Sequence, residues 1–208
     1  MKERPILFSA PMVRAILEGR KTQTRRTVKP CHMVLDHGED TSGRCINAGY
    51  IPCYPLCPYG HQGDRLYVRE SGWERPERTP HMMREGADTW PEFAYDADGW
   101  SEEDHADFKR WGFKRRPSIH MPRLYSRILL EIVSVRAERL NEISAPDCIA
   151  EGVNVHPDHY DKSDASIYSV ISAYYDLWTK INGQGSWEEN PWVWVVEFRK
   201  VGAGGTAT

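Results

Sequence analysis

Two long stretches without hydrophobic periodicity interrupt the predicted regular structure of this 208-residue chain. Residues 31–61 are rich in turn-forming residues, and residues 71–118 combine many charges with Pro and Gly. Several strands with interspersed short helices, and no regular strand–helix–strand alternation, remain outside these stretches. The sequence therefore predicts an α+β fold built around a small β-barrel, with flanking helices and large loop insertions.

The expected strands and helices follow one another irregularly. Five segments have the composition or the extended pattern of strands: 5–8, 22–28, 65–70, 126–135 and 192–201. Helices are expected at 9–18, 144–151 and 164–182, and each ends at a glycine: Gly19, Gly152 and Gly183. The longest helix carries its apolar residues on one face, as a helix that covers a core does.

Charge and hydropathy limit the classes of protein to which this chain can belong. The formal net charge is −3, so contact with nucleic acid would need a local basic patch. No apolar run approaches the ~20 residues that span a membrane, and the N-terminus lacks the apolar region of a signal peptide. An odd number of cysteines, five, favours reduced thiols. We expect a cytoplasmic protein with no membrane partner.

The length favours one domain with large loops. We predict a single domain over residues 1–201, with insertions at about 31–62 and 71–118. The polar, glycine-rich tail at 202–208 is expected to be disordered. The oligomeric state is left open by the sequence.

Residues 19–26, Gly-Arg-Lys-Thr-Gln-Thr-Arg-Arg, place four cations and two threonines directly after a predicted helix. Like charges this close repel one another unless an anionic or polar group faces them. A lysine whose pKa is lowered by Arg20, Arg25 and Arg26 can act as a base toward a hydroxyl or water. The structural alternative is that the cations complement the helix dipole, which contributes about 0.3–1 kcal/mol.

Lys21 and Thr24 need a turn between them if they are to meet one ligand. In a regular strand, residues three apart face opposite sides. The helix end at Gly19 allows such a turn, with Lys21 in the segment that leaves the helix and Thr24 in the strand. Both residues are candidates for one site on that condition.

Glu151 is expected in the last turn of the helix that Ser144 caps, directly before Gly152. The helix dipole disfavours a carboxylate there by roughly 0.3–1 kcal/mol. Such a charge is tolerable on a wet surface, or useful where a raised pKa suits acid–base chemistry. Glu151 is therefore a second candidate, and an ordinary surface glutamate is the alternative.

The turn-rich segment holds residue types that bind zinc, but not at the usual spacing. Three residues separate Cys53 from Cys57, and no second close pair exists. We expect no metal and no cofactor, with zinc on Cys31, Cys45, Cys53 and Cys57 as the alternative.

Two further segments are candidates for ligand contact. Residues 116–123 contain two prolines, which suit a stiff loop that presents His120 and Arg123, or a rigid connector into the next strand. Residues 111–116 combine aromatic and basic side chains, which suits single-stranded nucleic acid, although a solvated loop is the simpler interpretation.

These motifs in this order resemble the ASCH domain family. The resemblance rests on residues 19–26, Gly63-Asp64 with its strand, Ala150-Glu151-Gly152 and the closing strand at 194–198. The segments 11–17 and 118–123 are similar to the longer ASCH proteins encoded by phages and prophages. The family implies a PUA-like β-barrel and the binding of RNA or nucleotides.

A bacterial branch of that family hydrolyses N4-acetylcytidine to cytidine and acetate. By similarity, its catalytic lysine, threonine and glutamate correspond to Lys21, Thr24 and Glu151. The resemblance implies an amidohydrolase that acts on a modified cytidine nucleoside or RNA. Four residues are expected to bind substrate: Arg20, Arg26, His120 and Arg123. The competing hypothesis is a non-catalytic RNA-binding module of phage origin with the same fold.

Overall fold

The computed structural model describes residues 1–39, 45–53, 56–153 and 163–201, apart from the side chains at 34–39, 45–50, 88 and 165. Two compact units make up the chain. The first unit comprises residues 1–2, 20–64 and 131–199, and the second comprises residues 3–19, 65–130 and 200–208. The predicted tail at 202–208 lies outside the described residues. No described helix is long and apolar enough to cross a membrane.

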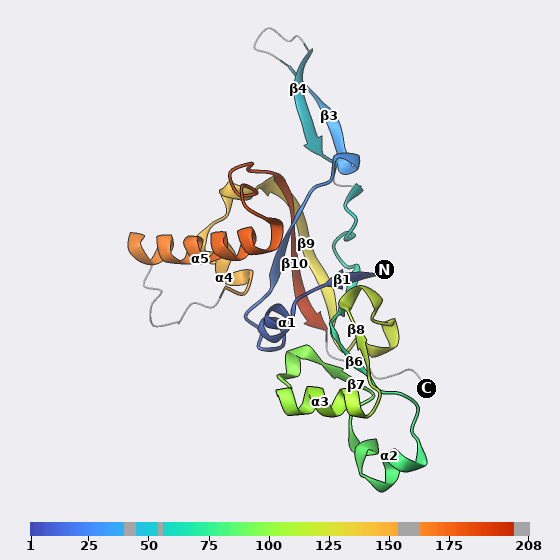
Figure 1. Cartoon of the computed structure of the whole chain (residues 1–208). Helices are drawn as coiled ribbons and strands as arrows, with labels where there is room; N and C mark the ends of the chain where they lie inside the picture. Colours follow the sequence, from blue (N-terminus) through green and yellow to red (C-terminus); the bar gives the residue numbers. More distant parts are fainter. Residues whose placement is uncertain (40–44, 54–55, 154–162, 202–208) are drawn as a thin grey trace. The chain divides into compact units, whose positions relative to one another are not determined.

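A sheet and a separate hairpin form the strands of the first unit (Figure 1). Within this unit, the neighbouring strands of the sheet follow in the order β9 (Leu129–Arg139), β10 (Trp192–Val201) and β2 (Gln23–Thr27). Strands β2 and β10 are antiparallel. The hairpin joins β3 (Met33–Glu39) to β4 (Cys45–Pro52), so the predicted insertion at 31–62 contains regular structure.

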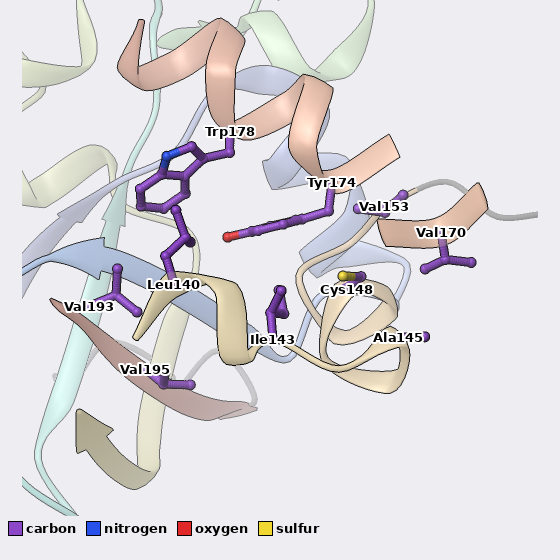
Figure 2. Close-up of a cluster of buried hydrophobic side chains, with 10 residues drawn as sticks. All are labelled: Leu140, Ile143, Ala145, Cys148, Val153, Val170, Tyr174, Trp178, Val193 and Val195. Carbon is purple, nitrogen blue, oxygen red and sulfur yellow. The ribbon is translucent and has the colours of Figure 1, made fainter. Parts of the chain in front are cut away.

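Helices α4 (Ala145–Ala150) and α5 (Asp164–Asn182) pack on this sheet. The Ser144 hydroxyl accepts a hydrogen bond from the Asp147 amide, and the Asp147 carboxylate accepts one from the Ser144 amide, which starts α4. Figure 2 shows Tyr174 and Trp178 of α5 in a cluster that also holds Cys148 of α4 and Val193 of β10. Burial of each large apolar side chain contributes roughly 1.5–3 kcal/mol.

Parallel strands β1 (Glu3–Leu7) and β5 (Arg65–Arg69) form the first part of the second unit. Helix α1 (Ala10–Leu17) follows β1 in the chain, and its residues Val13 and Ile16 are buried. Gly19 ends it with φ of 77°, a conformation that only glycine adopts readily.

Residues 71–118 fold around an aromatic cluster of their own. A small sheet has the order β7 (Phe93–Tyr95), β6 (Gly72–Glu74), β8 (Lys114–Arg116). Helices α2 (Pro80–Arg84) and α3 (Glu102–Arg110) accompany it. Phe108 is fully buried at the centre, and four tryptophans are packed against the cluster: Trp73, Trp90, Trp100 and Trp111.

Short 3-10 helices complete the described secondary structure: η1 (Pro30–His32), η3 (Ala87–Thr89), η4 (Asp96–Asp98), η5 (Ser118–His120), η6 (Arg123–Tyr125) and η7 (Leu140–Glu142).

The α+β class is confirmed, whereas the barrel is not. None of the sheets formed by the described strands closes on itself. The strand predicted at 126–135 is shifted: β9 runs from Leu129 to Arg139. In its charged end, Arg136 and Glu138 take part in ion pairs that the local sequence does not indicate. The single-domain assignment of 1–201 stays a prediction.

Candidate functional site

The chain between α1 and β2 runs along the end of α4. The Thr22 amide donates to the Ala150 carbonyl at 2.9 Å, and the Thr22 carbonyl accepts from the Phe198 amide at 2.8 Å. The exposed Arg20 donates to the Gly152 carbonyl at 3.4 Å. These contacts hold residues 20–22 between α4 and β10, so Lys21 is placed beside the helix end.

Lys21 and Glu151 meet there as a buried ion pair. Lys21 Nζ lies 2.9 Å from Glu151 Oε2, and it also donates to the carbonyls of Glu151 and Gln23 at 2.7 Å each. The side chains are 0% and 4% exposed. Three acceptors match the three donors of an ammonium group, so the charge is solvated by protein alone.

Arg25 holds the other oxygen of the same carboxylate. Its Nη1 donates to Glu151 Oε1 at 3.4 Å, and its Nη2 contacts Glu138 and, at 3.3 Å, Asp147 Oδ2. Gln23 Nε2 donates to Asp147 Oδ1 at 3.2 Å. The guanidinium therefore joins α4 to β9 from its position on β2.

Arg136 closes the outer side of this network. It donates to Glu138 Oε2 at 3.0 Å and to Asp147 Oδ1 at 3.4 Å, and it also contacts Glu197. Arg136 and Glu197 are partly exposed, whereas Lys21 and Arg25 are fully buried. The network therefore runs from solvent to the buried pair.

Burial is the main cause of a lowered pKa at Lys21. Glu151 opposes the effect, and the nearby Arg26 and Arg25 lower the pKa further. The sequence-based explanation relied on neighbouring cations and is thus incomplete, because desolvation dominates and the exposed Arg20 is not among the causes. A lysine of this kind loses its proton below its usual pH range and can serve as a base.

Neutral polar groups flank the charges. Burial raises the pKa of Cys148 to about 12 and that of Tyr174 well above its usual value. Both side chains are therefore uncharged at neutral pH.

Thr24 lies on β2 but faces away from this cluster. Gln23 and Arg25 both reach α4, and alternate residues of a strand point to opposite faces. Thr24 is buried opposite Val196 of β10, on the face that also carries Arg26. The structure thus brings Lys21 and Glu151 together and leaves Thr24 on the other side of the strand.

His120 and Arg123 belong to the second unit. Arg123 pairs with Glu3 at 3.0 Å and stacks 4.9 Å from the Tyr67 ring centroid, at an exposed position. His120 ends η5 and is also exposed. Their role in substrate binding stays a prediction.

The described thiols give no support to a zinc site. Cys31 is exposed, Cys53 is half-buried and Cys57 is buried. Among the side chains that the structure describes, no three His, Cys, Asp or Glu residues form a group that could hold a metal ion. The side chain of Cys45, the fourth candidate ligand, is not among the side chains that the structure describes.

Sequence reasoning missed Asp147 and Glu138 and treated Arg25 only as a neighbouring charge. A signal for two of them exists in retrospect. Asp147 lies one helical turn before Glu151, so these two residues share a face of the helix. Arg25 lies two residues after Gln23, so these two residues share a face of the strand. Glu138 has no comparable local signal.

A scan against protein-family models finds no match to this chain, and a search of curated proteins finds none either. A search of solved structures finds the high-resolution crystal structure of an ASCH domain from Lactobacillus crispatus JV V101. The two chains are 12% identical with a TM-score of 0.36, over 96% of this chain and 79% of that one. This chain is thus similar to a protein with the domain name that its motifs suggested, at a level too low to assign chemistry.

Proposed function

We propose that this protein binds acylated cytidine, as a nucleoside or in RNA, and hydrolyses the N4-acyl amide bond. One observation carries the proposal: a buried lysine with a lowered pKa lies 2.9 Å from a buried glutamate. A buried lysine with a perturbed pKa beside a charged partner is a common feature of catalytic sites. The resemblance of the surrounding motifs to ASCH amidohydrolases supplies the substrate class.

In the proposed reaction, water attacks the acyl carbonyl carbon while neutral Lys21 takes its proton. The tetrahedral intermediate then loses the N4 amine, which receives a proton by way of Glu151, and the products are a carboxylic acid and cytidine. Water is the attacking group because Thr24 faces the other side of β2. Since Lys21 is fully buried, the residues that cover the pair have to move when the substrate binds.

Hydrolysis of N4-acetylcytidine by purified protein tests the proposal. We expect Lys21→Met and Glu151→Gln to lower kcat/KM at least about 100-fold, which corresponds to about 2.7 kcal/mol. Lys29→Met, at an exposed position, is the matched control and should keep wild-type activity. The wild-type rate should rise with pH as Lys21 loses its proton, and level off below pH 10.5, its usual pKa.

Circular dichroism and thermal melting establish that each variant is folded. A wild-type rate no higher than that of folded Lys21→Met would sink the proposal. The buried pair would then be a structural cap for α4, in which the ammonium holds the terminal carbonyl of the helix.

A second candidate function is that of a non-catalytic RNA-binding module. It is supported by a surface of the second unit that combines basic and aromatic side chains. Arg110 lies 5.3 Å from the Trp111 ring centroid, and Arg115 lies 5.6 Å from that of Trp73. Lys114 is exposed on β8, which is an edge strand of its sheet. Stacked cations and aromatic rings suit the bases and phosphates of a single strand.

A further inference from the structure

Arg25 is a buried cation for which the proposed reaction has no role. Its side chain is fully buried on β2, opposite Val195 of β10. Burial of an isolated cation costs several kcal/mol, so a buried arginine is retained only where partners answer its charge. Here the partners are three carboxylates, and one of them is the proposed catalytic Glu151.

The two oxygens of Glu151 are divided between two cations. Oε2 lies 2.9 Å from Lys21 Nζ, and Oε1 lies 3.4 Å from Arg25 Nη1. A carboxylate bound by one cation can rotate about its last torsion, because that torsion is broad. Contacts at both oxygens restrict this rotation and set which oxygen faces the lysine.

Arg25 is itself held in place at its second terminal nitrogen. Nη2 contacts Glu138 of β9 and lies 3.3 Å from Asp147 of α4. Asp147 is fixed in turn by Gln23 and by the cap at Ser144, and Arg136 holds both acids from the outside. The planar guanidinium can serve these positions together, whereas a single ammonium cannot.

We propose that Arg25 is a positioning residue, which holds Oε1 of Glu151 so that Oε2 stays directed at Lys21. The inference rests on the proposed function, because it assigns Arg25 a part in the same reaction. Glu138 and Asp147 act one step further out, since they contact Arg25 rather than the reacting pair.

The position of Arg25 also bears on the proton affinity of Lys21. The charged groups that act on Lys21 are Glu151, Arg25 and Arg26, while Tyr174 of α5 and Cys148 of α4 are neutral at ordinary pH. Arg25 lowers the pKa of Lys21, so its removal should move the proton loss of Lys21 to higher pH.

Two variants separate geometry from charge. Arg25→Lys keeps a cation but cannot span the carboxylates, and we expect kcat to fall about tenfold or more with KM nearly unchanged. Arg25→Met with Glu138→Gln removes one cation and one anion together, and should shift the rising limb of the pH–rate profile to higher pH. Arg127→Lys makes the matched change at an arginine that binds Glu70 in the second unit, and should leave kcat and the profile unchanged.

The NMR titration of the Lys21 side chain provides a readout that does not need activity. Its signal is assigned by its loss in Lys21→Met, and its midpoint should move to higher pH in the protein with Arg25→Met and Glu138→Gln, which lacks the charge of Arg25. A folded Arg25→Lys protein with unchanged kcat, together with an unchanged pH profile and Lys21 midpoint in the double variant, would overturn the inference. If the wild type does not hydrolyse N4-acetylcytidine, the proposed function fails. The titration midpoint of Lys21 alone then decides whether Arg25 controls the protonation of Lys21.

Discussion

Among the side chains that the structure describes, two buried carboxylates face cations, and their surroundings differ. Glu151 lies between Lys21 and Arg25, whereas Glu70 of the second unit is bound at both oxygens by Arg127, at 3.1 and 3.0 Å. Arg127 also pairs with Asp98 and stacks 3.8 Å from the Tyr95 ring centroid. Burial raises the pKa of Glu70, Arg127 opposes this, and the nearby Asp98 and Asp96 add to it.

That raised pKa has a consequence for stability. Between the usual value of 4.5 and the higher pKa of the folded protein, the folded state binds more protons at Glu70 than the unfolded state does. The free energy of unfolding contributed by Glu70 therefore falls as pH rises through this window. Glu70→Gln has no such titration, so we expect wild-type stability relative to this variant to decrease as pH rises above 4.5.

Urea unfolding of both proteins over a series of pH values measures this difference, in which the other titrating groups cancel. A relative stability that grows with pH would show that Arg127 outweighs burial.

At the scale of elements, α4 matters because its C-cap residue is Glu151. Its N-terminal capping box has a close counterpart in α3, where the Ser101 hydroxyl accepts from the Asp104 amide at 3.1 Å. The two helices start in the same way, but only α4 leads to the candidate site.

This pair of helices offers a matched test of α4. Ser144→Ala and Ser101→Ala should each lower the free energy of unfolding by about 1 kcal/mol, through loss of the cap. Only Ser144→Ala should also reduce hydrolysis, several-fold, because the helix that it loosens carries Asp147 and Glu151. Thermal melts and steady-state rates measure the two effects, and an equal loss of activity in both variants would contradict the role given to α4.

At the scale of the whole molecule, a net charge of −3 makes any contact with RNA depend on a local surface. The basic and aromatic surface around β8 is such a place. Arg115 is already paired with Asp96 at 2.6 Å, so the exposed Lys114 is the better probe.

If that surface binds RNA, the affinity of a single-stranded oligonucleotide should fall steeply with salt. Lys114→Ala should weaken binding several-fold and flatten the salt dependence, whereas Lys29→Ala should do neither. Fluorescence anisotropy at several salt concentrations measures both. Binding that is absent, or insensitive to salt, would remove this candidate.

Some of this protein is determined by local sequence. The cap at Ser144, the apolar face of residues 164–182 and the glycine after each helix are set by the periodicity and stereochemistry of neighbouring residues, and the structure has these helices where the pattern predicts them. The choice of Lys21 and Glu151 as candidates also came from local context, since each charge follows or ends a helix.

Tertiary structure alone decided how those charges are paired. Lys21 and Glu151 are 130 residues apart, and Arg25 and Glu138 are 113 apart, so neither contact has a local signature. The pairing of β2 with β10 directs Arg25 toward α4 and turns Thr24 to the other face. Burial then lowers the pKa of Lys21, because desolvation depends on what packs around the ammonium and not on its neighbours in sequence.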